Sequence, residues 1–549
     1  MKKIYFSIIL LIGLLQAKSQ TIGLLQHDTG TLDDGYVLFA PIQSTTTYLI
    51  DKCGKQIKTW PSTYRPGQSC YILPDGTLLR SGNTNNSTFN AGGKGGIIQK
   101  IDWNGNVTWN YTISSNLECQ HHDIKALPNG NVLAIVWESK TNTEAIAAGR
   151  NPLLVPTTVW SEKIIEIQQT GLTTGTIVWE WHLWDHLVQD FDVSKANFGV
   201  VNTNPQLVNL NFNASTTGTA GLDWIHLNAI DYNPTLNQIM LSSHAFEEIW
   251  IIDHSTTTAQ AATNLGGNSG KGGSILYRWG NPRAYNNGTS ATQKLFGQHN
   301  AYWIESGFPF ENQIMIFNNG NGRIGGNYST VEIINPPVTG FNYTPTLPYG
   351  PTTTSWIYNN GNPNGIYAAN ISGAQQLSNG NVMLCDGPLG TFREVNSVGT
   401  TLWKYVSPIN NTGIIAQGTT PSQNIVFRSS FYPSNYSGFS GHTLNASNTI
   451  ENSNTASASC SLTLANADNF NENNLIFYPN PVRGVLNINF PTQLIFGNLT
   501  LINSIGQTVY SSVINSNIFS IDVNQFARGL YYLKVSSVKR QFVKKVIIE

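Results

Sequence analysis

The chain has 549 residues, and its 30 Lys and Arg side chains nearly balance 31 Asp and Glu, for a formal net charge of −1. Charged residues make up only 11 % of the chain, against roughly 25 % in ordinary soluble domains. The balance argues against a basic surface for nucleic acid, and 40 % apolar residues argue against disorder over most of the chain. Abundant Gly, Thr and aromatic residues favour an all-β fold.

The first element is an export signal. Met1–Lys3 is a short basic stretch, an apolar run follows over Ile4–Leu15, and small residues then indicate cleavage before Gln20. The run is shorter than the about 20 residues that a membrane-spanning helix needs, and polar residues break all later apolar runs. We therefore predict a signal peptide over residues 1–19, export of the chain, and no membrane span.

Two recurring phrases organise the middle of the chain. A turn phrase, Leu-Pro-Asp-Gly or a close variant before alternating apolar residues, predicts a β-hairpin. Its copies are Leu73–Leu78, Leu127–Val132 and Leu377–Val382. The second phrase is a Gly followed by a strand that ends in Trp, and its copies are Gly54–Trp60, Gly105–Trp109, Gly175–Trp179, Gly273–Trp279 and Gly399–Trp403. Together the phrases and the strands between them make a four-stranded sheet, and sheets repeated radially make a β-propeller.

Counting the first strands of these units predicts a six-bladed β-propeller. The first strands begin near Gln68, His121, His226, His299, Gly373 and Asn424. The last would pair with strands before Trp60 and so close the ring. Residues 182–221 carry no repeat phrase, and the Trp series is interpreted as blade core. An array of β-sandwiches is the alternative fold.

The end of the chain differs in composition. From about residue 443 to residue 474 it is mainly Ser, Asn, Ala and Thr, which is typical of a linker and leaves residues 20–442 for the propeller. Residues 475–549 are a compact β-rich unit marked by Tyr478–Pro481, Arg528–Tyr531 and a basic end. Over its full length this unit resembles the C-terminal sorting domain of proteins exported by the type IX system of Bacteroidota. The resemblance implies a small β-sandwich read by the type IX secretion machinery, and a chain that is secreted or held at the cell surface.

Five cysteines occur, and an odd count leaves at least one thiol free even where disulfides form. No two cysteines stand in a Cys-x-x-Cys pair, so a zinc site built on thiolates is disfavoured. On sequence separation we predict Cys53–Cys70 as the disulfide with the best support.

Histidines stand where the predicted blades begin. The innermost strand of each propeller blade lines the axis, so its first residues face the channel. His121, His122, His226 and His299 hold these positions in three consecutive blades. Imidazoles act near neutral pH as nucleophiles, acids or hydrogen-bond donors to an anionic group. Arg323, on a turn after the strand that follows His299, adds the bidentate donor fork that suits sulfate or phosphate oxygens.

These segments resemble the bacterial aryl-sulfate sulfotransferases. Asp223–Asn228 is similar to that family's Asp-Trp-x-His-x-Asn motif, Gln298-His299 to its Gln-His segment, and Asn318–Arg323 to a turn of the type Asp-Asn-Gly-Asp-Gly-Arg. The resemblance runs from about residue 30 to residue 440 and implies a six-bladed propeller. It also implies sulfuryl transfer from a phenolic sulfate ester to a phenol, without a nucleotide donor. We expect no cofactor and no metal.

The resemblance implies a ping-pong mechanism through a transient sulfohistidine. By that resemblance the catalytic group is His226, His299 and Arg323, with His122 as a further axial imidazole. The predicted substrate-binding residues are His121, Trp224, Asn228 and Asn300, with the Trp224 ring stacking on a phenol. The nucleophilic histidine of the family is expected on the last inner blades, where Cys385–Arg393 contains no histidine.

Two hypotheses follow from that departure. In the first, which we favour, another axial imidazole (His122, His226 or His299) is the nucleophile and the chain is an enzyme. In the second, the propeller has lost turnover and binds sulfated or aromatic ligands. His182 and His186 would bind metal if they lay on a helix, but their aromatic surroundings favour packing. The glycine-rich Gly266–Gly272 lacks the context of a phosphate loop.

Overall fold

The computed structural model describes residues 20–216, 222–344, 346–359, 361–362, 365–451, 460, 476–489, 498–504, 506–514, 518–537 and 540–549. The predicted signal peptide, residues 1–19, lies outside the described residues, as does most of the predicted linker. Within the described ranges, no helix is long and apolar enough to cross a membrane.

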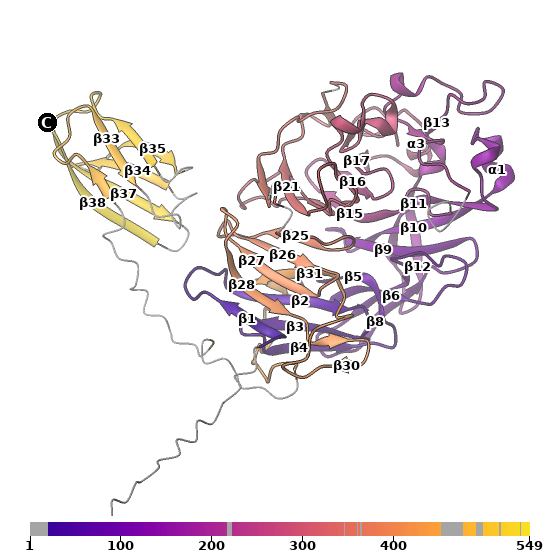
Figure 1. The fold of residues 1–549 in the computed structure, drawn as a ribbon, viewed down its shortest axis with the longest axis horizontal. Helices are drawn as coiled ribbons and strands as arrows, with labels where there is room; N and C mark the ends of the chain where they lie inside the picture. Colours follow the sequence, from indigo (N-terminus) through magenta and orange to yellow (C-terminus); the bar gives the residue numbers. More distant parts are fainter. Residues whose placement is uncertain are drawn as a thin grey trace, which may run out of the picture.

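Six antiparallel sheets, here called blades 1–6, follow one another around the large domain (Figure 1). Blade 1 contains β5 (Pro66–Ile72), β6 (Leu78–Asn83), β7 (Gly96–Ile101) and β8 (Val107–Thr112). Blade 2 contains β9 (Glu118–Ala126), β10 (Val132–Thr141), β11 (Thr158–Gln169) and β12 (Gly175–His182). Blade 3 contains β15 (Leu227–Asn233), β16 (Gln238–Ser243), β17 (Glu248–Asp253) and β18 (Tyr277–Trp279). Blade 4 contains β19 (His299–Trp303), β20 (Ile314–Asn318), β21 (Thr330–Ile334) and β24 (Trp356–Tyr358).

The last two blades join the two ends of the domain. Blade 5 contains β25 (Gly373–Gln376), β26 (Val382–Asp386), β27 (Thr391–Val395), β28 (Thr401–Val406) and, as a fifth strand, β1 (Gly23–His27). Blade 6 contains β31 (Val426–Pro433), β2 (Gly35–Pro41), β3 (Thr46–Asp51) and β4 (Gln56–Pro61). The predicted pairing of the last inner strand with N-terminal strands is therefore present, and the pairing of β1 with β28 closes the ring a second time.

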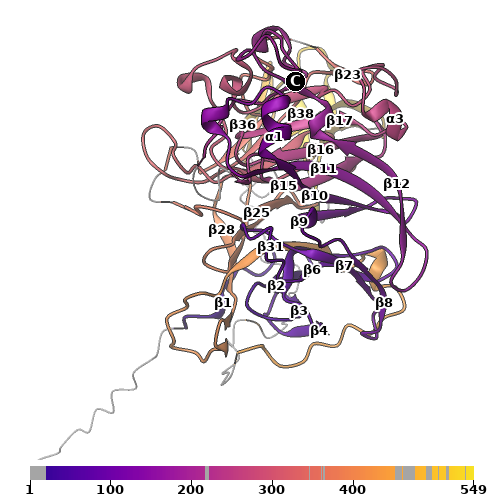
Figure 2. The ribbon, with the colours of Figure 1, turned by 90° about the vertical axis from the view of Figure 1, so that its right-hand side faces the viewer.

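The inner strands form a closed ring. Strand β9 packs against β5 and β15, β19 packs against β15 and β25, and β31 packs against β25 and β5. Figure 2 shows this arrangement from the side, with β9, β15, β25 and β31 in the middle of the domain. The prediction of a six-bladed propeller is confirmed, and the alternative of a sandwich array is excluded.

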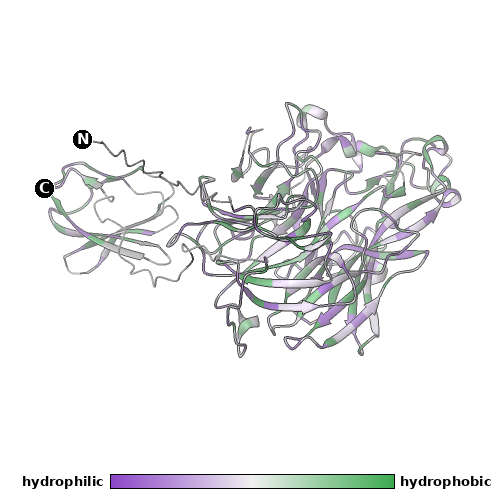
Figure 3. Cartoon of the chain, turned by 60° about the horizontal axis from the view of Figure 1, so that its bottom comes forward, coloured by the Kyte–Doolittle hydropathy of each residue, from purple (hydrophilic) through white to green (hydrophobic). Residues whose placement is uncertain are grey.

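The turn phrases form the hairpins that the sequence predicts. In each one the leucine N–H donates to the carbonyl four residues later, at 2.8–2.9 Å, and the glycine has a φ between 84° and 88°. That backbone region is open to glycine without a steric penalty. Hydrophobic and hydrophilic residues both occur along the strands (Figure 3), and every residue of β16, β17, β20, β21 and β26 is buried, because a blade packs between two neighbours.

Tryptophans on the outer strands, four of them the ends of predicted Trp phrases, join each blade to the next. An indole N–H from the outer strand of every blade donates to a backbone carbonyl of the following blade, at 2.6–3.1 Å. The pairs are Trp60 with Asp102, Trp109 with Thr174, Trp181 with Gly273, Trp279 with Pro351, Trp356 with Ser397, and Trp403 with Lys52. All of these rings except Trp356 are buried, so the Trp series is blade core whose polar atom is satisfied.

Insertions carry the short elements. The helices are α1 (Asn142–Ala147), α3 (Thr258–Ala261) and the 3₁₀ turns η1 (Pro152–Leu154), η2 (Leu183–Asp185), η3 (Val201–Thr203), η4 (Pro282–Tyr285), η5 (Ser290–Thr292) and η6 (Ser437–Phe439). Two-residue strand pairs are β13 (Leu187–Val188) with β14 (Val208–Asn209), β22 (Val338–Thr339) with β23 (Asn342–Tyr343), and β29 (Ile409–Asn410) with β30 (Gly413–Ile414). The stretch without a repeat phrase therefore packs as an insertion beside blades 2 and 3, and its apolar residues join their core.

The C-terminal unit is a separate β-sandwich, as predicted. One sheet holds β32 (Ile476–Tyr478), β33 (Val485–Asn489) and β36 (Ile518–Asp522). The other holds β34 (Asn498–Asn503), β35 (Thr508–Val513), β37 (Gly529–Ser537) and β38 (Arg540–Ile548). Side chains of both sheets share one buried apolar core, including Leu486, Leu501, Leu533 and Val546.

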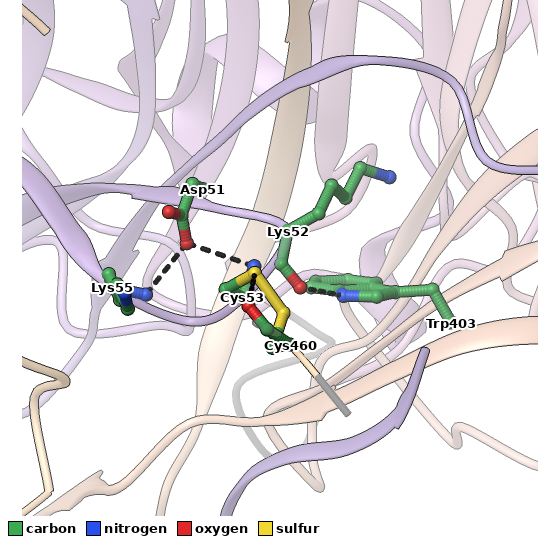
Figure 4. The surroundings of a disulfide bond; sticks show 6 residues. All are labelled: Asp51, Lys52, Cys53, Lys55, Trp403 and Cys460. Carbon is green, nitrogen blue, oxygen red and sulfur yellow. Dashed lines mark hydrogen bonds between the residues drawn. A yellow bond between two sulfur atoms is a disulfide. The ribbon is translucent and has the colours of Figure 1, made fainter. Parts of the chain in front are cut away.

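The disulfide prediction is wrong. Cys53 is bonded to Cys460, across a sequence separation of 407 residues (Figure 4), whereas Cys70 is a free, buried thiol on β5. Cys53 lies in the turn between β3 and β4, and the Asp51 carboxylate accepts its N–H at 2.9 Å. Sequence proximity misled because Cys70 points into the apolar core between blades, with Trp60 and Leu78.

Part of the predicted linker packs on the propeller. Thr449 bridges to Lys55 in an antiparallel arrangement, and the Ser447 N–H donates to the Gln56 carbonyl at 2.8 Å. Ile450 is buried in the core of blades 5 and 6. Leu444 is partly buried against a second core cluster, that of Trp60 and Phe439. Composition alone did not reveal this packing, because few apolar side chains anchor the segment.

Candidate active site

A repeated backbone irregularity shapes the inner strands at one end of the channel. Four inner hairpins, β5–β6, β9–β10, β15–β16 and β19–β20, contain a register shift. A non-glycine residue with positive φ lies within or just before five inner strands: Gln68, His122, His226, Asn300 and Ser372, with φ between 49° and 105°. Such positions cost on the order of 1–3 kcal/mol each and re-aim side chains, and they gather at functional sites.

Four histidine rings form a row across this end of the channel, here called the axial row. The centroids of His122 and His226 are 4.6 Å apart, those of His226 and His244 are 5.1 Å apart, and those of His244 and His299 are 5.3 Å apart. The Phe427 ring, on β31, lies 6.1 Å from His122 and 6.4 Å from His299. The structure thus brings together the three axial imidazoles that the sequence placed on different blades and adds a fourth.

His226 is the cationic member of the axial row. Its Nδ1 is hydrogen-bonded to the Asp223 carboxylate, which also accepts the Trp137 indole N–H at 2.9 Å. Burial opposes the charge, but the ion pair and hydrogen bond with Asp223 prevail and raise the pKa of His226 above its ordinary value. The side chain of His226 is 21 % exposed, which leaves its Nε2 side open to the channel.

The other three imidazoles are held neutral. Burial first, and then the nearby His226 charge, lower the pKa of His122 and of His244 well below 6.5. Burial lowers the pKa of His299 to about 3, although Nδ1 is hydrogen-bonded to the Asn319 side chain at 2.8 Å. The Nε2 of His299 accepts the Ile371 N–H at 3.2 Å. The site therefore combines one imidazolium with three imidazoles.

His121 positions His122 rather than reaching the channel. It is fully buried, its ring stacks on Trp137 at 3.8 Å, and its two nitrogens are taken by His122 Nδ1 at 2.8 Å and Glu162 at 2.7 Å. Burial raises the pKa of Glu162 well above its ordinary value. Because both nitrogens are hydrogen-bonded within the protein, the role of His121 in binding substrate stays a prediction.

Sequence reasoning missed His244. It lies just after β16, in the turn to β17, and its N–H donates to the His226 carbonyl at 3.0 Å. The prediction covered only the first residues of inner strands, whereas the second strand of blade 3 returns to the same end of the channel. Antiparallel pairing of β15 with β16 was the signal that could have found it.

Arg428 was also missed. This β31 residue donates to the Tyr71 hydroxyl at 3.0 Å and to the Asp123 carboxylate at 3.1 Å. Its side chain is only 10 % exposed, and its Nε and Nη2 have no hydrogen-bond partner among the described residues. The charge is close enough to contribute to the lowered pKa of His299. Arg428 thus supplies a buried cation beside the axial row.

Arg323 is engaged elsewhere on blade 4. Its guanidinium lies over the Tyr328 ring at 4.6 Å, donates to the Thr330 hydroxyl at 3.0 Å, and lies 4.0 Å from the Glu332 carboxylate. No contact joins it to the axial row within the described residues. Its buried Nε has no hydrogen-bond partner among the described residues.

The remaining predicted binding residues have structural contacts. Trp224 is 1 % exposed, donates to the Phe212 carbonyl at 2.8 Å and lies beneath the Arg150 guanidinium. Stacking of its ring on a phenol stays a prediction. The Asn228 amide donates to the Gln298 carbonyl at 2.7 Å.

The amide oxygen of Asn300 accepts the Ala374 N–H at 2.8 Å. Like Asn228, it joins one inner strand to the next. These hydrogen bonds are internal to the ring of inner strands, and substrate binding by the two amides stays a prediction.

The two histidines of the weaker motif contact residues of the fold. His182 is on β12, where it contacts Glu138 and Glu180. The Nε2 of His186 donates to the Ala261 carbonyl, and its ring stacks on Trp181. Among the described residues one group, His27 with Cys53 and Cys460, has metal-ligand spacing, but its two sulfurs form the disulfide.

Comparison with known families decides the affiliation. Residues 74–436, more than half of the chain, match the model of the family described as Arylsulfotransferase (ASST). The chain belongs to the arylsulfotransferase family. Membership supports sulfuryl transfer as the class of chemistry. Residues 476–549 match the secretion system C-terminal sorting domain, which implies secretion to the cell surface through the type IX system.

Solved structures are similar only at low identity. A protein of unknown function from Bacteroides caccae is 9 % identical with a TM-score of 0.39, over 72 % of this chain and 98 % of that one. The β-propeller domain of Cps50 (Swd1) from Myceliophteria thermophila is 7 % identical with a TM-score of 0.34, over 71 % of this chain and 87 % of that one. No curated protein matches this chain.

Proposed function

We propose that this arylsulfotransferase moves a sulfuryl group from a phenolic sulfate ester to a phenol acceptor. The reaction needs no nucleotide donor and proceeds by a ping-pong route through a sulfohistidine. The observation that carries the proposal is the axial row, in which one imidazolium faces three neutral imidazoles beside a buried arginine. That set holds a donor for a leaving phenoxide, lone pairs for attack at sulfur, and positive charge for sulfuryl oxygens.

Each chemical requirement has a residue to meet it. A phenoxide leaves more readily when a proton reaches its oxygen, and His226 carries that proton on Nε2 while Asp223 holds Nδ1. Sulfuryl oxygens are anionic, and Arg428 has guanidinium nitrogens without a partner among the described residues. Phe427 provides an apolar wall at the same end of the channel.

Arg323 is proposed to contribute less to sulfuryl binding than Arg428. Its family motif predicts a role in binding the sulfuryl group, while its contacts on Tyr328, Thr330 and Glu332 hold it on blade 4. His299 is proposed to position the row rather than to attack, because both of its nitrogens are hydrogen-bonded.

The test is a transfer assay with a chromogenic aryl sulfate and a phenol acceptor, in the absence of any nucleotide. We expect release of the coloured phenol and formation of the sulfated acceptor. His226→Gln should slow the reaction about 10²- to 10⁴-fold, the usual contribution of a general acid. His442→Gln, whose ring stacks on Trp103 at 4.3 Å on the outer side of the domain, is the matched control and should keep full activity.

The alternative, a propeller that binds sulfated or aromatic ligands without turnover, rests on the stretch Cys385–Arg393. It contains no histidine; Cys385 is a buried free thiol, and Asp386 lies 3.6 Å from the Arg393 guanidinium. Binding of the aryl sulfate with no phenol released, with or without acceptor, would favour this alternative.

The sorting domain carries a proposal of its own. We infer that the type IX machinery reads residues 475–549, and that a signal peptide over residues 1–19 directs earlier export. Secretion to the culture medium or cell surface, measured with and without residues 475–549, tests this inference. A chain that still reaches the surface without those residues would contradict it.

A further inference from the structure

The turn after β16 places His244 inside the axial row. Its ring lies between those of His226 and His299, at centroid distances of 5.1 and 5.3 Å. Its position is fixed by the backbone, because the His244 N–H donates to the His226 carbonyl at 3.0 Å. A substrate sulfur that reached the row would therefore meet His244 with an imidazole on either side.

His244 is also the member of the row with both nitrogens available. Neither ring nitrogen makes a hydrogen bond to any residue that the structure describes, and the side chain is only partly buried. A Cβ at Gly297 would lie 3.2 Å from its Nε2, so the glycine keeps the approach to that atom clear. By contrast, hydrogen bonds occupy both nitrogens of His299 and the Nδ1 of His226.

His122 is the competitor, and its neighbours decide against it. The hydrogen-bond chain runs from Glu162 through His121 to the Nδ1 of His122. The raised pKa of Glu162 favours its protonated form, which donates to His121, and His121 then donates to His122. His122 consequently keeps its own proton on Nε2 and presents a donor, not a lone pair, to the channel.

We propose that His244 is the nucleophile that carries the sulfuryl group between donor and acceptor. The inference rests on the proposed function and names its covalent residue, which the stretch Cys385–Arg393 does not provide. The neutral form needed for attack is the one that burial and the His226 charge maintain near pH 7.

The two half-reactions balance. A His244 nitrogen forms a bond to sulfur, the bond from sulfur to the phenolic oxygen breaks, and the departing oxygen takes the Nε2 proton of His226. The products are sulfo-His244 and a free phenol. In the second half-reaction an acceptor phenol gives its proton to His226, its oxygen bonds to sulfur, and the bond from sulfur to His244 breaks.

The experiment mixes the full chain rapidly with an aryl sulfate, without acceptor, and measures both the first burst of phenol and the labelled peptide. We expect a burst of one phenol per chain and a sulfuryl group on the peptide that contains residue 244. His244→Gln should lose the burst, and added imidazole should restore phenol release to His244→Ala. Rescue by imidazole separates a nucleophile from a residue that merely supports the fold.

Two results overturn the inference in distinguishable ways. If the wild type shows the burst but the sulfuryl group maps to the peptide of His122 or His226, the nucleophile is another residue and the proposed function survives. A normal burst in His244→Gln leads to the same conclusion. If the wild-type chain releases no phenol although it is as well folded as His442→Gln, the proposed function fails together with the inference.

Discussion

Histidines at the outer end of blades 2 and 3 differ from those of the axial row. The two nitrogens of His254 contact the Asn237 side chain and the Glu166 carboxylate, each at 2.9 Å. His186 has the Ala261 carbonyl at 2.8 Å. These rings have polar partners from elements packed around them, and their hydrogen bonds stabilise the fold.

Three of the four rings in the axial row have at least one nitrogen without such a partner among the described residues, whereas both nitrogens of His299 are hydrogen-bonded. Four rings share a single carboxylate, that of Asp223, and the charge of His226 lowers the pKa of His122, His244 and His299. Such crowding lowers stability and is retained where another group is bound in turnover. In this propeller, missing partners therefore distinguish a candidate catalytic histidine from a structural one.

The largest loss of transfer rate is expected when Asp223, whose carboxylate is hydrogen-bonded to His226, is replaced. Asp223→Asn keeps the side chain's shape but removes the charge that raises the pKa of His226, so His226 would lose its proton at pH 7. We expect the transfer rate to fall about 10²- to 10⁴-fold, measured as kcat with a chromogenic aryl sulfate. The far-ultraviolet circular dichroism spectrum should stay unchanged. A variant with wild-type kcat would remove the distinction between His226 and its neighbours.

Replacing Arg428 and replacing Arg323 should change the affinity for an aryl sulfate by different, smaller factors. Arg428→Gln should weaken the binding of an aryl sulfate about 10- to 100-fold, since a hydrogen bond to a charged group contributes about 1.5–3 kcal/mol. Arg323→Gln, the matched control, should change binding less because its guanidinium is held on blade 4. Calorimetric titration of both variants with the same aryl sulfate measures this. The opposite ranking would return the anion site to Arg323.

Lowering the pH should lower the free energy of unfolding, because His299 is buried in its neutral form. His299 is neutral when folded, with a pKa of about 3, and takes up a proton near pH 6.5 when unfolded. The unfolded chain therefore binds more protons below pH 6.5, and the folded state loses about 1.4 kcal/mol per pH unit from this residue until its folded pKa is reached. Denaturant titrations between pH 7 and 5 should show a shallower loss in His299→Gln than in wild type. Parallel curves would contradict the buried, neutral state of His299.

The smallest effect concerns the outer histidines. His254→Gln should lower the free energy of unfolding at pH 7 by about 1 kcal/mol, because it breaks the contact with Glu166. His244→Gln should leave that free energy unchanged or raise it, because it relieves crowding. Thermal unfolding of the two variants compares them, and equal losses would mean that both histidines are structural.

Local patterns predicted most of the fold. The three turn phrases and five Trp phrases each specify one hairpin or one outer strand, and the first strands counted between them specify six blades. The pairing of Cys53 with Cys460 could not be predicted in this way, because it depends on a segment that returns to the first turn only after the ring has closed. The anchoring of Ile450 depends on the same return.

The site was predictable only where a motif lies on an inner strand. His122, His226 and His299 satisfy that condition. His244 follows the second strand of blade 3, and Arg428 lies on a strand without a motif, so their approach to the axis depends on how the blades pair. Arg323 carries a motif, but the rings and hydroxyl around it, including Tyr328 and Thr330, hold its guanidinium on its own blade.

A covalent route through the axial histidines is tested by the intact mass of the chain during one reaction cycle. After exposure to a phenolic sulfate without acceptor, we expect a gain of one sulfuryl group per chain, and complete loss of that group when a phenol acceptor is added. The His226→Gln variant should gain it far more slowly. A wild-type chain that turns over the donor with no change in mass at any time would contradict the covalent route.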